Sequence, residues 1–130
     1  MYAILGWILV AAVIIMAAPY WLRIPARIFG IKGAGYKRLI KILRAVHKPL
    51  GAALVVIVVV HGFLALGVCR LHTGVIAGAF LIITAAFGGA FFIFKKKRLF
   101  MLHRLSALLL SIFVLVHLIF PSAVFYLFGI

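Results

Sequence analysis

The chain has no aspartate, glutamate, asparagine or glutamine among its 130 residues. The oxygen-rich sites that hard divalent cations prefer therefore cannot be built from its side chains. Cys69 is the only cysteine, so an internal disulfide is excluded, and we expect it to be a small apolar residue at a helix end. Apart from tyrosine and tryptophan, the polar side chains are fourteen lysines and arginines, five histidines, three serines and two threonines.

Apolar residues make up 69% of the chain, and its mean hydropathy is +1.42. A chain this apolar belongs in a bilayer, where long runs form helices because backbone groups must be satisfied internally. The net charge of +14 could suggest a nucleic-acid partner. The charges lie at the ends of apolar runs, however, as membrane insertion requires, so we expect membrane lipid and no nucleic acid as a partner.

The apolar runs predict an all-α membrane protein, a bundle of four transmembrane helices forming one domain over residues 1–130. The first run lacks a preceding basic residue and is too long for a signal peptide, so we expect it to be retained. A basic segment rich in glycine and proline, residues 23–42, should lie on the membrane surface. The expected spans are residues 2–22, 43–68, 74–94 and 99–125.

The basic residues alternate between the connections. Residues 23–48 hold eight lysines and arginines, the turn after the second span holds only Arg70, and residues 95–104 hold five. The positive-inside tendency places the first and third connections in the cytoplasm and both termini outside. The second and fourth spans then run in the same direction.

Each of these two spans carries a pair of histidines 14 residues apart, His47 with His61 and His103 with His117. Fourteen residues make about four helical turns and a rise of about 21 Å, so each pair projects from one helix face. If the two faces meet, His47 pairs with His103 at an inner level and His61 with His117 at an outer level.

Two histidines at each level limit the metal chemistry. Zinc takes four nitrogen or sulfur ligands, whereas haem iron needs only two axial ligands from the protein. We therefore expect two b-type haems, and hydrogen bonds between the helices or another metal as the alternative. Gly74 and Gly88 are also 14 residues apart. They indicate either ordinary small-residue packing or room for a flat macrocycle at each level.

With these histidines and glycines, roughly residues 40–120 resemble a small di-haem membrane cytochrome b. The chain is similar to the cytochrome b of respiratory bc complexes and to the four-helix cytochrome b subunits of membrane-bound hydrogenases and formate dehydrogenases. The resemblance implies an electron-transfer subunit of a larger redox complex in a bacterial or archaeal cytoplasmic membrane, with quinone as an optional partner. The quinone-site loops of the bc cytochromes are missing.

Several cations are candidate partners for haem propionates. We expect Lys41, Arg44, Lys48 and Arg104 to serve the inner haem and Arg70 the outer one. This basic collar should raise the potential of the inner haem. The helical stripe that contains the first three of these cations, and begins at Lys37, is equally suited to lipid phosphates.

The remaining polar residues have several candidate roles. His72 is an interfacial polar residue, a hydrogen-bond donor to a propionate or quinone, or an alternative axial ligand. Thr73 is a candidate N-cap. Thr84, Ser106 and Ser111 should bond to their own helix backbones.

Two other functions stay open on the sequence alone. The first is a free-standing transmembrane reductase that passes electrons to an external acceptor. The second is a haem-free structural or small-ion membrane protein, which requires the histidine spacing to be accidental.

Overall fold

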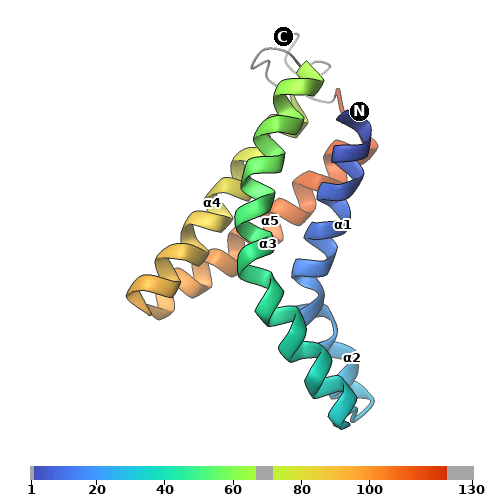
Figure 1. Cartoon of the computed structure of the whole chain (residues 1–130), viewed down its shortest axis with the longest axis vertical. Coiled ribbons are helices and arrows are strands. Elements are labelled where there is room, and N and C mark those ends of the chain that lie inside the picture. The colour runs from blue at the N-terminus through green and yellow to red at the C-terminus, as the bar shows by residue number, and fades with distance from the viewer. Residues whose placement is uncertain (1, 67–71, 123–130) are drawn as a thin grey trace.

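The computed structural model describes residues 2–66 and 72–122, and in them the chain is all-α (Figure 1). Four of its helices are long and apolar enough to cross a membrane, as the sequence predicts. Cys69 and Arg70 lie outside the described residues. The helices are α1 (Tyr2–Trp21), the short α2 (Arg23–Ile28), α3 (Ala34–Leu66), α4 (Thr73–Phe94) and α5 (Lys97–Ile119).

The helix α3 is longer than the second span expected from the sequence. It has 33 residues and begins at Ala34, so residues 34–42 belong to this helix and not to the basic loop. The helical stripe expected from Lys37 onward is confirmed. The helix continues through Pro49, which therefore does not start it. At about 1.5 Å per residue α3 is roughly 50 Å long, well beyond the roughly 30 Å of a bilayer core. Its basic N-terminal part can therefore extend past the lipid.

The helices pair as two antiparallel hairpins, α1 with α3 and α4 with α5, which contact each other chiefly through α3 and α4. Figure 1 shows the hairpins crossing and then diverging toward the end that holds α2 and the α4–α5 turn. The α4–α5 hairpin is close-packed, with Phe80 stacked on Phe113 at 4.8 Å between ring centres. Such van der Waals contacts, and not the exclusion of water, hold membrane helices together.

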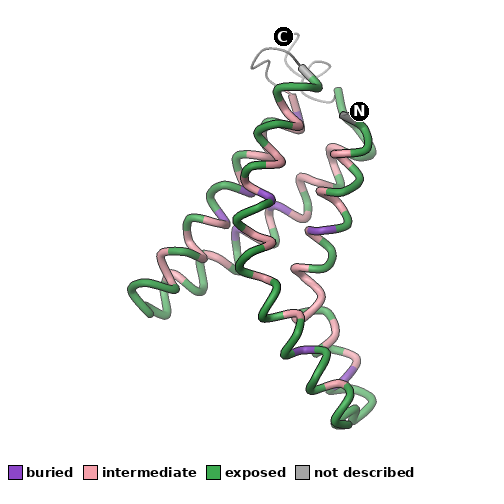
Figure 2. Tube along the Cα trace, viewed as in Figure 1, coloured by how far each residue is buried: buried purple, intermediate pink, exposed green. Residues whose placement is uncertain are grey.

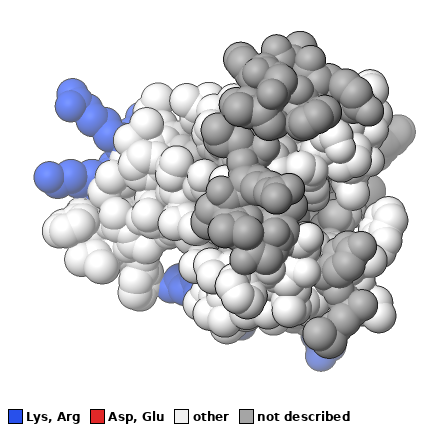
Figure 3. Space-filling model, turned by 90° about the horizontal axis from the view of Figure 1, so that it is seen from above, with Lys and Arg blue, Asp and Glu red and all other residues white. Residues whose placement is uncertain are grey.

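The connection between α1 and α3 and the turn between α4 and α5 lie at the same end of the molecule (Figure 1). These are the two lysine- and arginine-rich connections. Figure 3 looks onto the opposite end, where the described surface is mostly white and blue atoms appear only at the margins. The described cations are thus gathered at one end, which the positive-inside tendency predicts to be cytoplasmic.

One residue from each long helix forms the buried core: Ala12, Leu54, Leu81 and Leu110. Leu54 is fully buried, with 0% of its surface exposed. Elsewhere buried residues are few, and most of the trace is exposed or intermediate in Figure 2. Between the ends of the long helices the exposed surface is largely apolar, with side chains such as Trp7 and Phe63 facing outward, which is what a lipid-facing surface requires.

The core lies midway between the two histidine levels. Leu54 is seven residues from both His47 and His61, and Leu110 is seven residues from both His103 and His117. Seven residues correspond to a rise of about 10 Å. An apolar layer therefore separates the two levels.

Candidate functional site

At the inner level, α3 and α5 bring together the histidines that the sequence pairs. The ring centres of His47 and His103 are 6.0 Å apart, and the ring planes are inclined at 79°. Two metal–imidazole bonds of about 2 Å, with roughly 1 Å from each nitrogen to its ring centre, span about 6 Å. The separation would suit two imidazole ligands on one metal ion, and it also lies in the range of an edge-to-face contact between two rings.

The orientation of His103 is fixed by α4. Its Nδ1 atom lies 2.9 Å from the backbone oxygen of Thr84. A carbonyl oxygen only accepts hydrogen bonds, so Nδ1 must carry the hydrogen. In the neutral ring the lone pair is then on Nε2, the atom that a metal would bind. His47 lies on the α1 side of this level, with its ring near the backbone of Met16.

Gly88 permits this approach of His103 to α4. A Cβ atom at position 88 would lie 3.0 Å from Nδ1 of His103 and 3.1 Å from its Cε1. Any side chain would therefore push the imidazole away from the Thr84 carbonyl. The space that the sequence assigns to a macrocycle at this glycine is filled by the imidazole itself.

At the outer level α4 holds His117 through a side chain. The Nδ1 atom of His117 is 3.0 Å from Oγ1 of Thr73, and the same hydroxyl donates to the backbone oxygen of Pro121 at 2.6 Å. The hydroxyl has one hydrogen, so it accepts from Nδ1 of His117 and leaves the lone pair on Nε2. A Cβ at Gly74 would lie 3.0 Å from Cε1 of His117, so this glycine has the same role as Gly88.

His61 lies against α1. A Cβ at Gly6 would be 3.2 Å from Cε1 of His61. His61 is also close enough to His117 for the two rings to interact electrostatically. The sequence gives no indication of Gly6, because a single glycine in an apolar span is ordinary. Its position in the span opposite His61 becomes visible only when α1 and α3 are paired.

His72 is a third histidine at the outer level. Its ring centre is 5.4 Å from that of His117. Its Nδ1 atom accepts a hydrogen bond from the backbone N–H of Gly74 at 3.3 Å, which makes His72 the N-cap of α4. The neutral ring then carries its hydrogen on Nε2 and can donate there but cannot bind a metal. This geometry favours a donor role over that of an alternative ligand.

Two expectations about the threonines are wrong. Thr73 is the first residue of α4 and not its N-cap, and its hydroxyl binds His117. The Thr84 hydroxyl does not bond to its own helix; its oxygen is buried without a partner in the described part of the chain. Ser106 and Ser111 bond to backbone oxygens of α5, as predicted.

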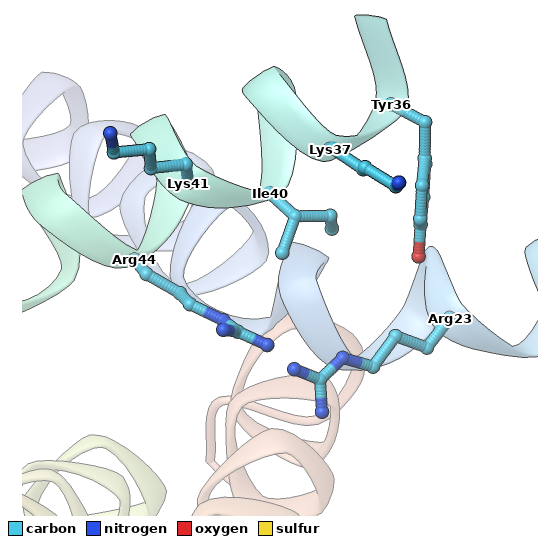
Figure 4. A pocket seen from close by; sticks show the side chains of 6 residues that line it. All are labelled: Arg23, Tyr36, Lys37, Ile40, Lys41 and Arg44. Atoms are coloured by element: carbon cyan, nitrogen blue, oxygen red, sulfur yellow. The ribbon is translucent and has the colours of Figure 1, made fainter. Parts of the chain in front are cut away.

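The predicted propionate partners separate into different places. The Lys48 ammonium lies 3.6 Å from the ring centre of Phe92, and that of Lys95 lies 4.2 Å from the same ring. The Arg104 guanidinium lies 5.3 Å from the ring of Tyr20. Arg44 instead lines a pocket between α2 and α3, together with Arg23, Tyr36, Lys37, Ile40 and Lys41 (Figure 4).

Within residues 2–66 and 72–122, no three histidine, cysteine or acidic side chains are grouped so that they could hold a metal ion by themselves. Comparisons with protein-family models, curated proteins and solved structures give no match.

Proposed function

We propose that the chain transfers electrons across the membrane through two b-type haems, each bound between two histidines. His47 and His103 would bind the inner haem, and His61 and His117 the outer one. The single observation that carries the proposal is the 6.0 Å separation of the His47 and His103 rings. This is about the spacing that one iron with two axial imidazoles requires.

The ring orientations support the same proposal. Hydrogen bonds to Thr84 and Thr73 hold His103 and His117 by Nδ1, and each Nε2 then carries the lone pair that an iron ion would bind. Metal-binding histidines are usually held in this way by a second partner. Both threonines and both glycines that admit the rings belong to α4, so one helix prepares two ligands at once.

Bound haem would supply a one-electron centre, and two axial histidines would leave its iron no open position for oxygen or substrate. The protein would bind and orient the two centres and keep them apart with the layer around Leu54 and Leu110. Lys48 and Arg104 directly follow His47 and His103 in sequence, so we propose them as the cations that would serve the inner propionates. Such propionates would supply anions that the polypeptide lacks.

Within residues 2–66 and 72–122, little of the chain lies outside the four long helices. We therefore propose that it works as a subunit of a membrane redox complex, exchanging electrons with other subunits or with quinone. Co-purification of redox subunits would support this form of the proposal. Reduction of an external acceptor by the isolated chain would instead support a free-standing reductase.

The deciding experiment is a dithionite-reduced minus oxidised spectrum of the purified protein, expressed with ample haem, with haem quantified per chain. We expect sharp low-spin b-type bands and two haems per chain. His47→Ala or His103→Ala should remove one haem, and His61→Ala or His117→Ala the other. The matched control His72→Ala should keep both. Protein that folds but contains no haem would refute the proposal.

A further inference from the structure

A pocket between α2 and α3 gathers another set of polar groups, away from the histidines. It has a cavity volume of about 390 Å³, within the range of roughly 300–1,000 Å³ usual for small-molecule sites. Four of its six lining residues are cations: Arg23, Lys37, Lys41 and Arg44. Tyr36 adds a hydroxyl, and the buried Ile40 closes the apolar side.

The cations have no anion to balance them, because the chain contains no acidic side chain. Figure 4 shows the guanidinium groups of Arg23 and Arg44 turned toward each other across the pocket, with the Tyr36 hydroxyl directed to the same side as Arg23. Lys41 points away from this centre. Two guanidinium groups that face each other repel unless an anion lies between them. Their planar forks suit the oxygens of a phosphate group.

The surroundings of the pocket indicate where such a phosphate comes from. Apolar side chains of α2 and the residue after it are strongly exposed, with Ile28 at 71% and Phe29 at 76%. The exposed aromatic pair Tyr20 and Trp21 ends α1 just before α2, as is typical of headgroup depth. The pocket thus combines a cationic centre with apolar flanks at the expected lipid–water boundary.

We propose that this pocket binds the phosphate headgroup of an anionic phospholipid, with the acyl chains along the exposed apolar side chains of α2. Arg23, Arg44 and Lys37 would hold the phosphate oxygens, and Tyr36 would donate a hydrogen bond. The bound lipid would neutralise the junction of α2 with α3 and join these helices to the bilayer. The proposal does not depend on haem.

The test is native mass spectrometry of the purified full chain during titration with phosphatidylglycerol, and separately with phosphatidylcholine. We expect one phosphatidylglycerol to bind before any phosphatidylcholine. The double variant Arg23→Gln/Lys37→Gln should weaken that binding by about tenfold or more, because it removes charge-assisted hydrogen bonds. Arg23→Lys keeps the charge but loses the planar, bidentate donor geometry of the guanidinium. Its affinity for phosphatidylglycerol should therefore lie between those of the unaltered chain and the double variant.

The matched control is Lys32→Gln/Arg38→Gln, which removes the same two kinds of charge from neighbouring residues that do not line the pocket. We expect it to change binding less than about twofold, since rim charges outside a site contribute little. Equal losses in both double variants would show unspecific charge attraction and overturn the proposal. Helicity and detergent-phase monodispersity, measured on each variant, confirm that the comparison is between folded proteins.

Two further measurements identify the source of the phosphate. Inorganic phosphate should not displace the lipid, because it lacks acyl chains; displacement at millimolar concentration would overturn the lipid assignment. Haem is quantified on the same samples. If Arg23→Gln/Lys37→Gln loses haem as well as lipid, the pocket belongs to the haem site. That result would also overturn the proposal of a separate lipid site. A chain without haem that still binds phosphatidylglycerol supports the pocket even if the proposed function fails.

Discussion

The Nδ1 atom of His103 lies 2.9 Å from the backbone oxygen of Thr84, and Gly88 is what allows that distance. Gly88→Ala should displace the imidazole and remove the inner haem, so that haem per chain falls from two to one. Gly89→Ala is the matched control, because a Cβ there meets nothing within 4 Å. The measurement is haem per chain from the reduced spectrum. An unchanged haem content in folded Gly88→Ala would contradict the assigned role.

The Thr73 hydroxyl should matter to the outer site because it accepts the Nδ1 hydrogen of His117. Thr73→Val keeps the shape and removes the acceptor, and we expect it to weaken outer haem binding by about 10- to 100-fold. Thr73→Ser should restore it. Haem retention during dilution into haem-free detergent measures how much more weakly each variant holds the outer haem than the unaltered chain does.

Thr84→Val is the counterpart in the same helix, and we expect it to bind haem normally. The Thr84 hydroxyl is buried without a partner in the described residues, and only the carbonyl of this residue contacts His103. Replacing an unpartnered buried hydroxyl by a methyl group should leave stability equal or slightly higher. A loss of haem as large as in Thr73→Val would show that the hydroxyl contacts the ligand.

The cations next to the inner ligands should raise the potential of the inner haem, since positive charge disfavours the oxidised iron. Lys48→Gln and Arg104→Gln are each expected to lower that potential, by an amount on the order of tens of millivolts. Lys97→Gln, at the start of α5, is the control of equal charge. A redox titration followed in the b-type bands measures the shift. An inner haem that is clearly the lower-potential centre in the unaltered chain would count against the basic collar.

Leu54 should be the most sensitive apolar position, because it is completely buried between the two levels. Leu54→Ala leaves a cavity at the junction of the hairpins, and we expect it to cost about 2–4 kcal/mol of unfolding free energy. Val56→Ala, at a position 64% exposed, should cost much less. Unfolding in mixed detergents followed by circular dichroism compares the two. Similar losses for both would mean that the core is not at Leu54.

The four long helices could be predicted from the sequence because each apolar run is long, uncharged in its middle and bounded by cations or aromatics. The helical stripe from Lys37 onward could be predicted too, but the start of this helix at Ala34 and its continuation into the second span could not. Gly33, Gly35 and the dense cations of residues 32–44 are typical of a surface connection, but the helix already begins at Ala34. The charged side chains of this segment project from α3, and its backbone stays helical. Local composition alone does not distinguish such a helix from a surface loop.

At the site, the prediction depends on the equal spacing of 14 residues within the histidine pairs and between the two glycines. His47 and His103 meet as their positions suggest, and Gly74 and Gly88 lie at the two levels. The hydrogen-bond partners of these residues could not be predicted from the sequence. The contact with Thr84, for example, uses a backbone carbonyl, which every residue has. Gly6 and Met16 become relevant only through the pairing of α1 with α3, and the sequence contains no pattern that fixes that pairing. The sequence allows several roles for His72, and only its hydrogen bond from the backbone N–H of Gly74 distinguishes them.

The placement of both Nδ1 partners on α4 has a consequence for how the chain assembles. Membrane helices first insert separately and then associate. The helices α4 and α5 are neighbours in the chain, so their hairpin can orient His103 and His117 before α3 packs against it. With the proposed haems, the cofactor would be captured on one hairpin and would recruit the other through His47 and His61. The cofactor would then act as a template for the last folding step.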